Sequence, residues 1–156
     1  MSRYAANTSV SVAKSKGEIE DLLQRYGASQ FVSGWDGDTA VVGFVFNDRH
    51  IRFDIALPSR SDKEFTRTET GRVRSDKQAH AAWEQANRAR WRALLLVIKA
   101  KLEAVECGIS TIELEFMAWT VVPGTNRTIA EFIEPQMAKA IETGRPPQLL
   151  LGPGNV

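Results

Sequence analysis

The sequence has few of the residues that build catalytic or metal centres. Cys107 is the single cysteine, which excludes an intrachain disulfide framework and favours a reducing compartment. Its neighbours are mostly apolar, so we expect a small core residue rather than a reactive thiol. His50 and His80 have no companion at ligand spacing, and no metal site is predicted. The glycine motifs of phosphate loops, dinucleotide folds and serine hydrolases are also missing, so we assign no catalytic residue and no cofactor.

Long hydrophobic runs are missing as well. The longest apolar stretch covers residues 93–98, far short of the ~20 residues that a membrane-spanning helix needs. Residues 1–10 contain no apolar run of the kind found in secretory signal peptides. We therefore expect neither membrane insertion nor secretion, and we predict a cytoplasmic location.

What the chain does have is an ordinary globular composition. Its 156 residues, of which 43% are hydrophobic and 25% charged, are typical of one domain with its own core. We predict a single domain over 1–156. Within it, we expect a flexible N-terminus at about 1–14, a basic and mobile loop at 59–75, and an extended C-terminal tail at 145–156.

A short helix and a three-stranded sheet are predicted for the first third of the chain. Ser15 and Glu18 have capping-box spacing, and Gly27 offers a left-handed end, which together predict a helix over 16–26. Runs of β-branched, aromatic and alternating apolar residues predict three strands after this helix, over 30–35, 39–46 and 51–57. The dipeptides between these strands are typical of hairpin turns: Asp36-Gly37 and Asn47-Asp48. Because apolar and polar residues alternate in the third strand, we expect an antiparallel meander with one solvated face.

A long helix is predicted between Ser75 and Gly108. Ser75 and Gln78 form a second capping pair, and nothing interrupts the helix for about 32 residues, a length of ~48 Å. Large apolar side chains fall on one side of it: Trp83, Trp91, Leu94, Ile98, Leu102 and Val105.

The last third repeats the pattern of helix starts. The pairs Ser110 with Glu113 and Thr128 with Glu131 predict two further helices, or one helix and a short strand. Pro135 either kinks the second helix or marks its first turn. The predicted class is α+β: a short helix, a three-stranded antiparallel meander, one long helix packed on it, and two shorter C-terminal helices.

Charge is distributed unevenly. Residues 49–101 contain 13 Lys or Arg against 6 Asp or Glu, and the rest of the chain contains 7 against 13. A near-neutral protein that gathers cations in one loop and one helix is predicted to bind a polyanion. On the long helix, Arg88, Arg92 and Lys99 lie within about 40° of one another, opposite the apolar side, although a solvated helix face would have the same pattern. We predict phosphate contacts from seven side chains: Arg52, Arg72, Arg74, Lys77, Arg88, Arg92 and Lys99.

Aromatic residues accompany these cations. Phe65 lies in the basic loop among threonines, and a flexible basic segment with an aromatic group for stacking is the usual equipment for binding single strands. Trp83 and Trp91 are interpreted as core residues. Trp35, beside a hairpin turn, is expected to be the most exposed tryptophan.

The order of the predicted elements resembles the shared core of the single-strand annealing proteins of the Red-beta and RecT kind. The segments that carry the resemblance lie in residues 16–108 and include "FVSGW", "TAVVGFVF", "HIRFDIAL" and "EQANRARWRALLLVIKAKLEAVECG". The segments "RYAANTSVSV" and "RWRALLLVIKAKLEAVE" are also similar in sequence to segments of a set of small phage and prophage proteins. The resemblance implies that single-stranded DNA binds in a groove between the meander and the long helix, and that subunits assemble into rings or filaments.

Three functions follow from these observations. The leading hypothesis is a non-enzymatic, homo-oligomeric phage protein that binds and anneals single-stranded DNA during recombination or replication in the bacterial host cytoplasm. The alternative is a small phage interaction protein that inhibits or redirects a host or defence component through protein contacts. An enzyme is the third, and no motif supports it.

Overall fold

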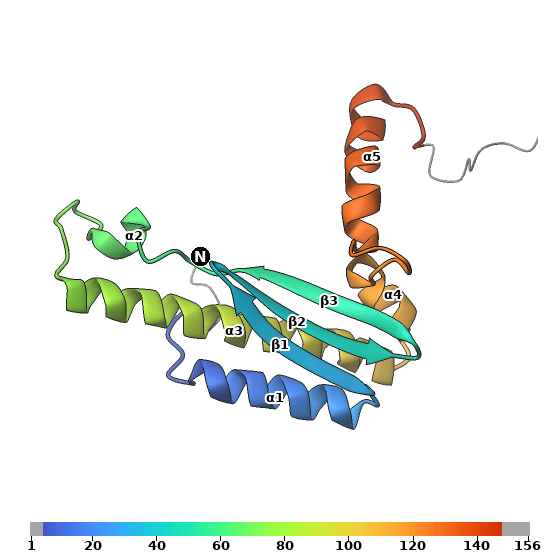
Figure 1. Cartoon of the computed structure of the whole chain (residues 1–156), viewed down its shortest axis with the longest axis horizontal. Helices are drawn as coiled ribbons and strands as arrows, with labels where there is room; N and C mark the ends of the chain where they lie inside the picture. Colours follow the sequence, from blue (N-terminus) through green and yellow to red (C-terminus); the bar gives the residue numbers. More distant parts are fainter. Residues whose placement is uncertain (1–4, 148–156) are drawn as a thin grey trace, which may run out of the picture.

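The computed structural model describes residues 5–147 and confirms the predicted α+β class (Figure 1). The elements follow one another as helix α1 (Val12–Arg25), strands β1 (Gln30–Asp36), β2 (Thr39–Phe46) and β3 (Arg49–Ala56), the short helix α2 (Lys63–Thr66), the long helix α3 (Asp76–Glu106), helix α4 (Ile112–Phe116), the 3₁₀ helix η1 (Met117–Trp119) and helix α5 (Ile129–Thr143). The parts of the predicted flexible ends at 1–4 and 148–156 lie outside the described residues.

The three strands form an antiparallel meander in the order β1-β2-β3. Asp36 pairs with Thr39, so the first turn is made by Gly37 and Asp38, and Gly37 has a φ of +56°. The second turn contains Asn47 and Asp48, with φ of +47° and +61°. Two left-handed residues in a two-residue loop match the right-handed twist of the flanking strands, and this holds for the predicted Asn47-Asp48 turn. The first turn lies one residue later than the predicted dipeptide Asp36-Gly37, because Asp36 still pairs within the sheet.

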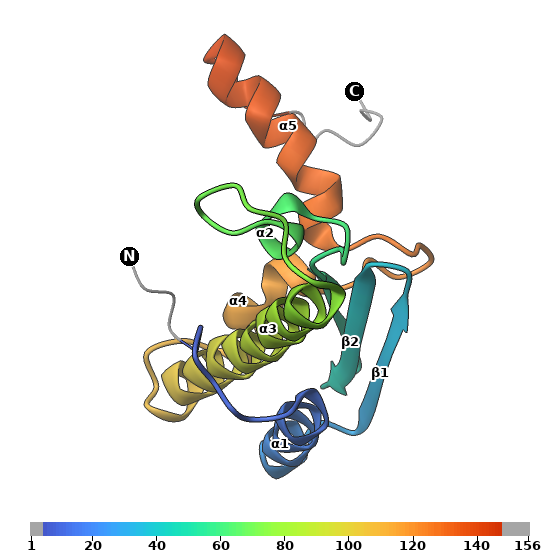
Figure 2. The ribbon, with the colours of Figure 1, turned by 90° about the vertical axis from the view of Figure 1, so that its left-hand side faces the viewer.

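One face of the sheet forms the core. Figure 2 shows α1 and α3 on the same side of the sheet, with no helix over the other side. The strand residues buried in this core are Ala40, Val42, Phe44, Phe46, Ile51, Phe53 and Ile55, and the helices meet them with Ile19, Leu22, Leu23, Trp91, Leu94, Leu95, Ile98 and Leu102. Each large apolar side chain buried in this way contributes about 1.5–3 kcal/mol, so the core-facing side of the sheet fixes the register of all three strands.

The ends of α3 agree with the prediction. Ser75 accepts a hydrogen bond from the Gln78 N–H, the Gln78 side chain returns to the Ser75 N–H, and Gly108 follows the helix at φ +71°. The start of α1 differs from the prediction. Ser11, not Ser15, is the N-cap, because its hydroxyl accepts from the Lys14 N–H; Ser15 lies inside the helix and is buried.

Helix α1 runs along α3, and polar contacts join them from end to end. These contacts are Gln85 with the carbonyls of Ala6 and Thr8, Arg92 with Glu18, and Tyr26 with Glu106. The hydrogen bond to the Glu106 carboxylate is the main cause that raises the pKa of Tyr26 to about 12. The segment before α1 is thus hydrogen-bonded to α3 from Ala6 onward.

The C-terminal region contains the two predicted helices. Thr111, one residue after the predicted Ser110, caps α4 and accepts from the Leu114 N–H. Thr128 and Glu131 form the predicted capping box of α5, and Pro135 lies within α5 rather than in its first turn. Helix α5 projects away from the rest of the molecule in both views (Figures 1 and 2). None of the helices in the described part of the chain is long and apolar enough to cross a membrane.

Candidate functional site

The predicted phosphate-binding residues lie in four separate places: on β3, between α3 and α1, at the amino end of α3, and at Lys99 farther along α3. Arg52 projects from β3 on the face of the sheet opposite the helices. Its guanidinium is held by the Asp54 carboxylate at 2.9 Å, the Asn126 carbonyl at 2.9 Å and the Glu131 carboxylate at 3.1 Å. These partners already use the donors and the charge of Arg52, so it is not available for a phosphate.

Arg88 and Arg92 lie in the seam between α3 and α1. Arg92 forms an ion pair with Glu18 of α1, and the two side chains are 28% and 35% exposed. Arg88 is half-buried and donates to the Gln85 side chain. Arg88, Arg92 and Lys99 were predicted to lie opposite the apolar side of α3. For Arg88 and Arg92 this prediction is wrong, because both lie on the flank of α3 that packs against α1 and the segment before it.

The remaining predicted cations are more accessible. Arg72, Lys77 and Lys99 are exposed and form no ion pair within residues 5–147. Arg74 donates to the carbonyls of Glu64 and Phe65 and so fastens α2 to the start of α3.

Phe65 itself corrects another expectation. Its ring is buried, anchoring α2, so it cannot stack on a base. The segment predicted as a mobile loop thus contains a helical turn, and Arg67 and Val73 pair across it. Arg72, Arg74 and Lys77 lie close together in the chain around the amino end of α3, and Arg88 and Arg92 lie on neighbouring turns beside α1, so the predicted cations do not form one continuous track.

A groove that combines aromatic rings with cations lies at this same end of the molecule. It is a cavity of about 610 Å³ between the β1–β2 hairpin, the first turn of α1 and the first half of α3. The side chains that give it chemical character are Lys16, Trp35, Asp38, Arg60, Trp83, Asn87 and Trp91, so two cations and one carboxylate line it. We call it the tryptophan groove.

Trp35 forms the exposed wall of the tryptophan groove. Its side chain is 74% exposed, as the position beside the hairpin turn predicted. Such a large exposed ring has no packing role in the core, since its strand neighbour Ala40 already closes that end of the sheet. One indole face is thus free for a flat ligand.

Trp83 and Arg60 form the facing wall. The Trp83 indole N–H donates to the Pro58 carbonyl at 2.7 Å, which fixes the ring. The Arg60 guanidinium lies 4.1 Å from the ring centroid, and the His80 ring stacks at 5.6 Å. Arg60 is exposed, so its planar guanidinium presents both a positive charge and a stacking surface beside the groove.

The floor contains Trp91, Lys16 and Asn87. Trp91 belongs to the core, as predicted, and the Lys16 ammonium lies 4.5 Å from its ring centroid. Asn87 is only 8% exposed, and its Oδ1 accepts no hydrogen bond from any described residue. A buried amide oxygen without a partner costs about 1–3 kcal/mol, a feature that native proteins usually keep for a reason.

The tryptophan groove suits a ligand with flat rings and negative charge. An indole wall and a guanidinium plane can stack on bases, two cations can contact phosphates, and an amide can bond a base edge. Sequence reasoning predicted the exposure of Trp35 and a basic loop over 59–75, which contains Arg60, but it assigned a binding role to neither residue. It missed Lys16 and Asn87, because their meeting depends on how α1 packs against α3, which leaves no local signal.

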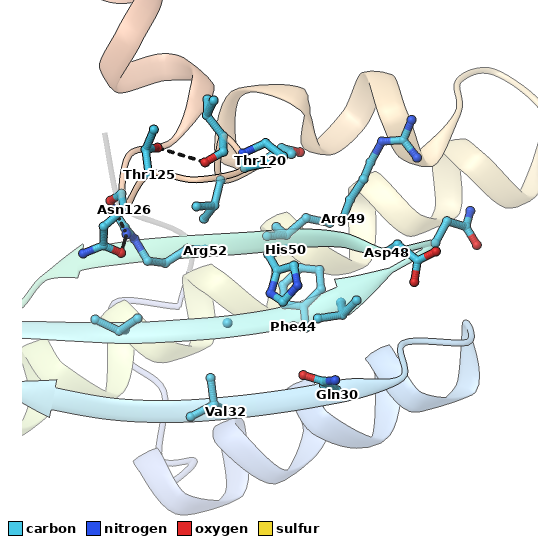
Figure 3. A pocket seen from close by; sticks show the side chains of 18 of the residues that line it. Gln30, Val32, Phe44, Asp48, Arg49, His50, Arg52, Thr120, Thr125 and Asn126 are labelled. Atoms are coloured by element: carbon cyan, nitrogen blue, oxygen red, sulfur yellow. Dashed lines mark hydrogen bonds between the residues drawn. The ribbon is translucent and has the colours of Figure 1, made fainter.

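A second cavity, of about 930 Å³, lies on the uncovered face of the sheet (Figure 3). Its floor contains Val32, Val41, Gly43 and Val45, and the loop of residues 120–126 forms one wall. His50 lies at one end, and Arg52 with Asn126 at the rim (Figure 3). We call this surface the open face. It shares no lining residue with the tryptophan groove.

Side chains for metal or thiol chemistry are not grouped in either place. Within residues 5–147, no cluster of three or more His, Cys, Asp or Glu is arranged to hold a metal ion. Cys107 caps the end of α3 and is exposed, which corrects the expectation of a core cysteine. Desolvation and the nearby Glu103 carboxylate raise the pKa of its thiol, which disfavours the reactive thiolate.

Comparison with known proteins gives no assignment. The chain has no significant match to a protein-family model, to a curated protein or to a solved structure. The resemblance to single-strand annealing proteins stays a prediction drawn from the order of elements.

Proposed function

We propose that the protein binds single-stranded DNA in the tryptophan groove. The observation that carries this proposal is the placement of Trp35: a 74% exposed indole faces a cavity whose opposite wall is a stacked guanidinium. Successive bases of a single strand stack on such surfaces with little dependence on sequence. The groove lies between the meander and the long helix, where the resemblance to annealing proteins places the strand.

The size and shape of the groove favour unpaired over paired bases. A cavity of about 610 Å³ is in the range that holds a small ligand, which is the size of one or two nucleotides rather than a duplex. A duplex also hides its base faces in its own stack, so Trp35 could reach them only after unpairing. We therefore expect single strands to bind more tightly than duplex of the same sequence.

Phosphate contacts would begin at Lys16 and Arg60 and continue toward the amino end of α3. Lys77 precedes Trp83 by six residues, about 9 Å along the helix axis, and Arg72 is close to it in the chain. If Lys16 and Arg60 each neutralise one phosphate, log affinity falls with log salt with a slope of about −1.4, and contacts from Arg72 and Lys77 would steepen it to about −2.8. Arg52, Arg88 and Arg92 are left out because other groups hold them.

The biological setting belongs to the same proposal. The resemblance supports a non-enzymatic annealing role in phage recombination or replication, carried out in the host cytoplasm by a homo-oligomer. Annealing requires that a bound strand keep most of its pairing edges accessible, and stacking on flat faces allows this, with Asn87 positioned to bond the edge of a single base in the groove.

Fluorescence anisotropy with labelled oligonucleotides, single-stranded and duplex, tests the proposal. Trp35→Ala should weaken single-strand binding about 5- to 150-fold, the equivalent of about 1–3 kcal/mol for one base stack. Leu114→Ala, an exposed apolar residue on α4, is the matched control and should bind as the wild type. Equal affinity of Trp35→Ala and wild type would refute the groove.

The cations provide a second comparison. Arg60→Ala should weaken binding and make the salt slope shallower by about 0.7, whereas Lys99→Ala, on the exposed part of α3, should leave both unchanged. If Lys99→Ala lowers the affinity for DNA and Arg60→Ala does not, DNA binds along the exposed side of α3 around Lys99 and not in the tryptophan groove.

The alternative function, an interaction protein, is favoured by one observation. Helix α5 carries exposed apolar residues, including Ile141 and Met137, with no cover in the described chain. Such a surface indicates a protein contact. It predicts association that is insensitive to Trp35→Ala and weakly dependent on salt.

A further inference from the structure

Asp38 places an unpaired carboxylate in the tryptophan groove. It follows Gly37 in the turn between β1 and β2, is exposed, and lines the cavity. Its backbone carbonyl accepts a hydrogen bond from the Leu57 N–H at 2.7 Å, which ties the turn to the end of β3. Within residues 5–147 the Asp38 carboxylate forms no ion pair. The fold therefore holds this residue by its backbone and leaves its carboxylate available.

The two cations of the groove lie over indole rings instead of pairing with Asp38. The Lys16 ammonium is 4.5 Å from the centre of the Trp91 ring. The Arg60 guanidinium is 4.1 Å from the centre of the Trp83 ring. Neither cation forms an ion pair in the described part of the chain. A donor for the Asp38 carboxylate can thus come from a ligand.

Asn87 supplies a second acceptor in the same groove. It is 8% exposed, and its buried Oδ1 has no hydrogen-bond partner among the described residues. Asn87 belongs to α3 and Asp38 to the hairpin, so two separate elements bring these acceptors to one cavity. A ligand N–H that reaches Oδ1 removes the cost of an unpaired buried acceptor. The groove therefore favours a flat ligand whose edge carries more than one donor.

The four DNA bases differ in the donors of their pairing edges. Guanine has donors on two adjacent atoms, the N1–H and the N2 amino group. Adenine and cytosine each have one amino group beside a ring-nitrogen acceptor, and thymine has a single N–H between two carbonyl oxygens. An ionised carboxylate only accepts, so it attracts N–H groups and repels the lone pairs of ring nitrogens and carbonyls. Two acceptors in one groove thus match guanine best.

We propose that the tryptophan groove selects guanine, and that Asp38 and Asn87 determine this preference. The inference rests on the proposed function and deepens it, because stacking holds any base and the two acceptors set which base is held most tightly. In a duplex both guanine donors already bond the partner base, so only an unpaired guanine offers them. Lys16 and Arg60 remain for the neighbouring phosphates.

Labelled hexanucleotides that differ at one position test the preference by fluorescence anisotropy. One strand contains thymine throughout, and four others carry guanine, adenine, cytosine or hypoxanthine at the third position. Adenine has the same two fused rings as guanine, so the comparison separates recognition of the edge from stacking. Hypoxanthine is guanine without the N2 amino group, so it removes one donor group and keeps the rest of the edge.

Asp38→Asn is the test variant, and Asp36→Asn is its matched control. Both carboxylates are exposed and lie in the same hairpin, but Asp36 does not line the groove. Each substitution removes one negative charge, so an effect of charge alone would appear in both variants. Circular dichroism on the full chain checks that each variant is folded.

We expect the wild type and Asp36→Asn to bind the guanine strand about 5- to 150-fold more tightly than the thymine strand, the range for one good bidentate base contact. They should also bind it more tightly than the adenine and hypoxanthine strands. Asp38→Asn should lose most of the guanine preference, while its affinity for the thymine strand stays equal or rises because a negative charge near the phosphates is gone.

Two results would overturn the inference and leave the proposed function standing. One is equal affinity of the wild type for the guanine and adenine strands; the other is a guanine preference that Asp38→Asn does not reduce. In both cases Trp35→Ala would still weaken the binding of every strand. A wild type that binds none of the five strands would refute the proposed function, and the guanine preference with it.

Discussion

Replacing Asn87 by leucine should stabilise the protein and weaken its binding of single strands. The Oδ1 atom of Asn87 is buried and accepts no hydrogen bond within the described residues. Leaving such an acceptor unpaired costs about 1–3 kcal/mol, and an apolar side chain of similar size removes that cost. The adjoining cavity of about 610 Å³ leaves room for the leucine methyl groups.

The expected gain is about 1–2 kcal/mol in the free energy of unfolding, which for a domain of this size is a rise in Tm of about 2–8 °C. Removing the amide also deletes the acceptor for one N–H of a base, so affinity for a single-stranded oligonucleotide should fall about 2- to 12-fold. Thermal denaturation followed by circular dichroism, and anisotropy titration of the same samples, measure the two effects.

Gln85→Leu is the matched control on the same helix. The Gln85 amide donates to the carbonyls of Ala6 and Thr8 at 2.8 and 2.9 Å, so its loss leaves two acceptors without their donor. The same kind of substitution two residues away should therefore lower Tm. If Asn87→Leu also lowers Tm, or raises it with unchanged affinity, the argument that Asn87 is kept for a ligand fails.

Two further predictions concern charges that the fold has already paired. Arg92→Glu should lower the free energy of unfolding by about 1–2 kcal/mol in urea denaturation, because it replaces a partly buried ion pair with two facing carboxylates, while Lys99→Glu should have little effect. Glu131 has a lowered pKa, mainly because the Thr128 backbone N–H and hydroxyl bond its carboxylate, with smaller contributions from Arg52 and Arg127. Its contribution is therefore complete above the unfolded pKa of about 4.3 and is lost as the pH falls through the lower folded pKa. Wild type should lose more stability between pH 5 and pH 3 than Glu131→Gln, and equal losses would contradict this.

The sequence predicted the elements that depend on local signals. The capping pair Ser75 and Gln78 identified the start of α3, and Asn47-Asp48 identified a hairpin, because each interaction lies within a few residues of chain. The first helix was placed four residues too late, since Ser11 caps it without the acidic partner that completes a capping box.

The site was less predictable because it depends on which surfaces meet. A helical wheel separates an apolar from a polar side of α3, but it does not show that α1 covers the flank with Arg88 and Arg92. Lys16 and Asn87 belong to different helices and become neighbours only through that packing. The prediction for Trp35 was confirmed because a hairpin end has few neighbours that could bury a ring.

The Arg52 side chain couples the orientation of α5 to the sheet. Its guanidinium bonds the Asp54 carboxylate on β3, the Asn126 carbonyl in the loop before α5 and the Glu131 carboxylate in the first turn of that helix. Removing this one guanidinium would therefore loosen the loop and the base of the helix at the same time.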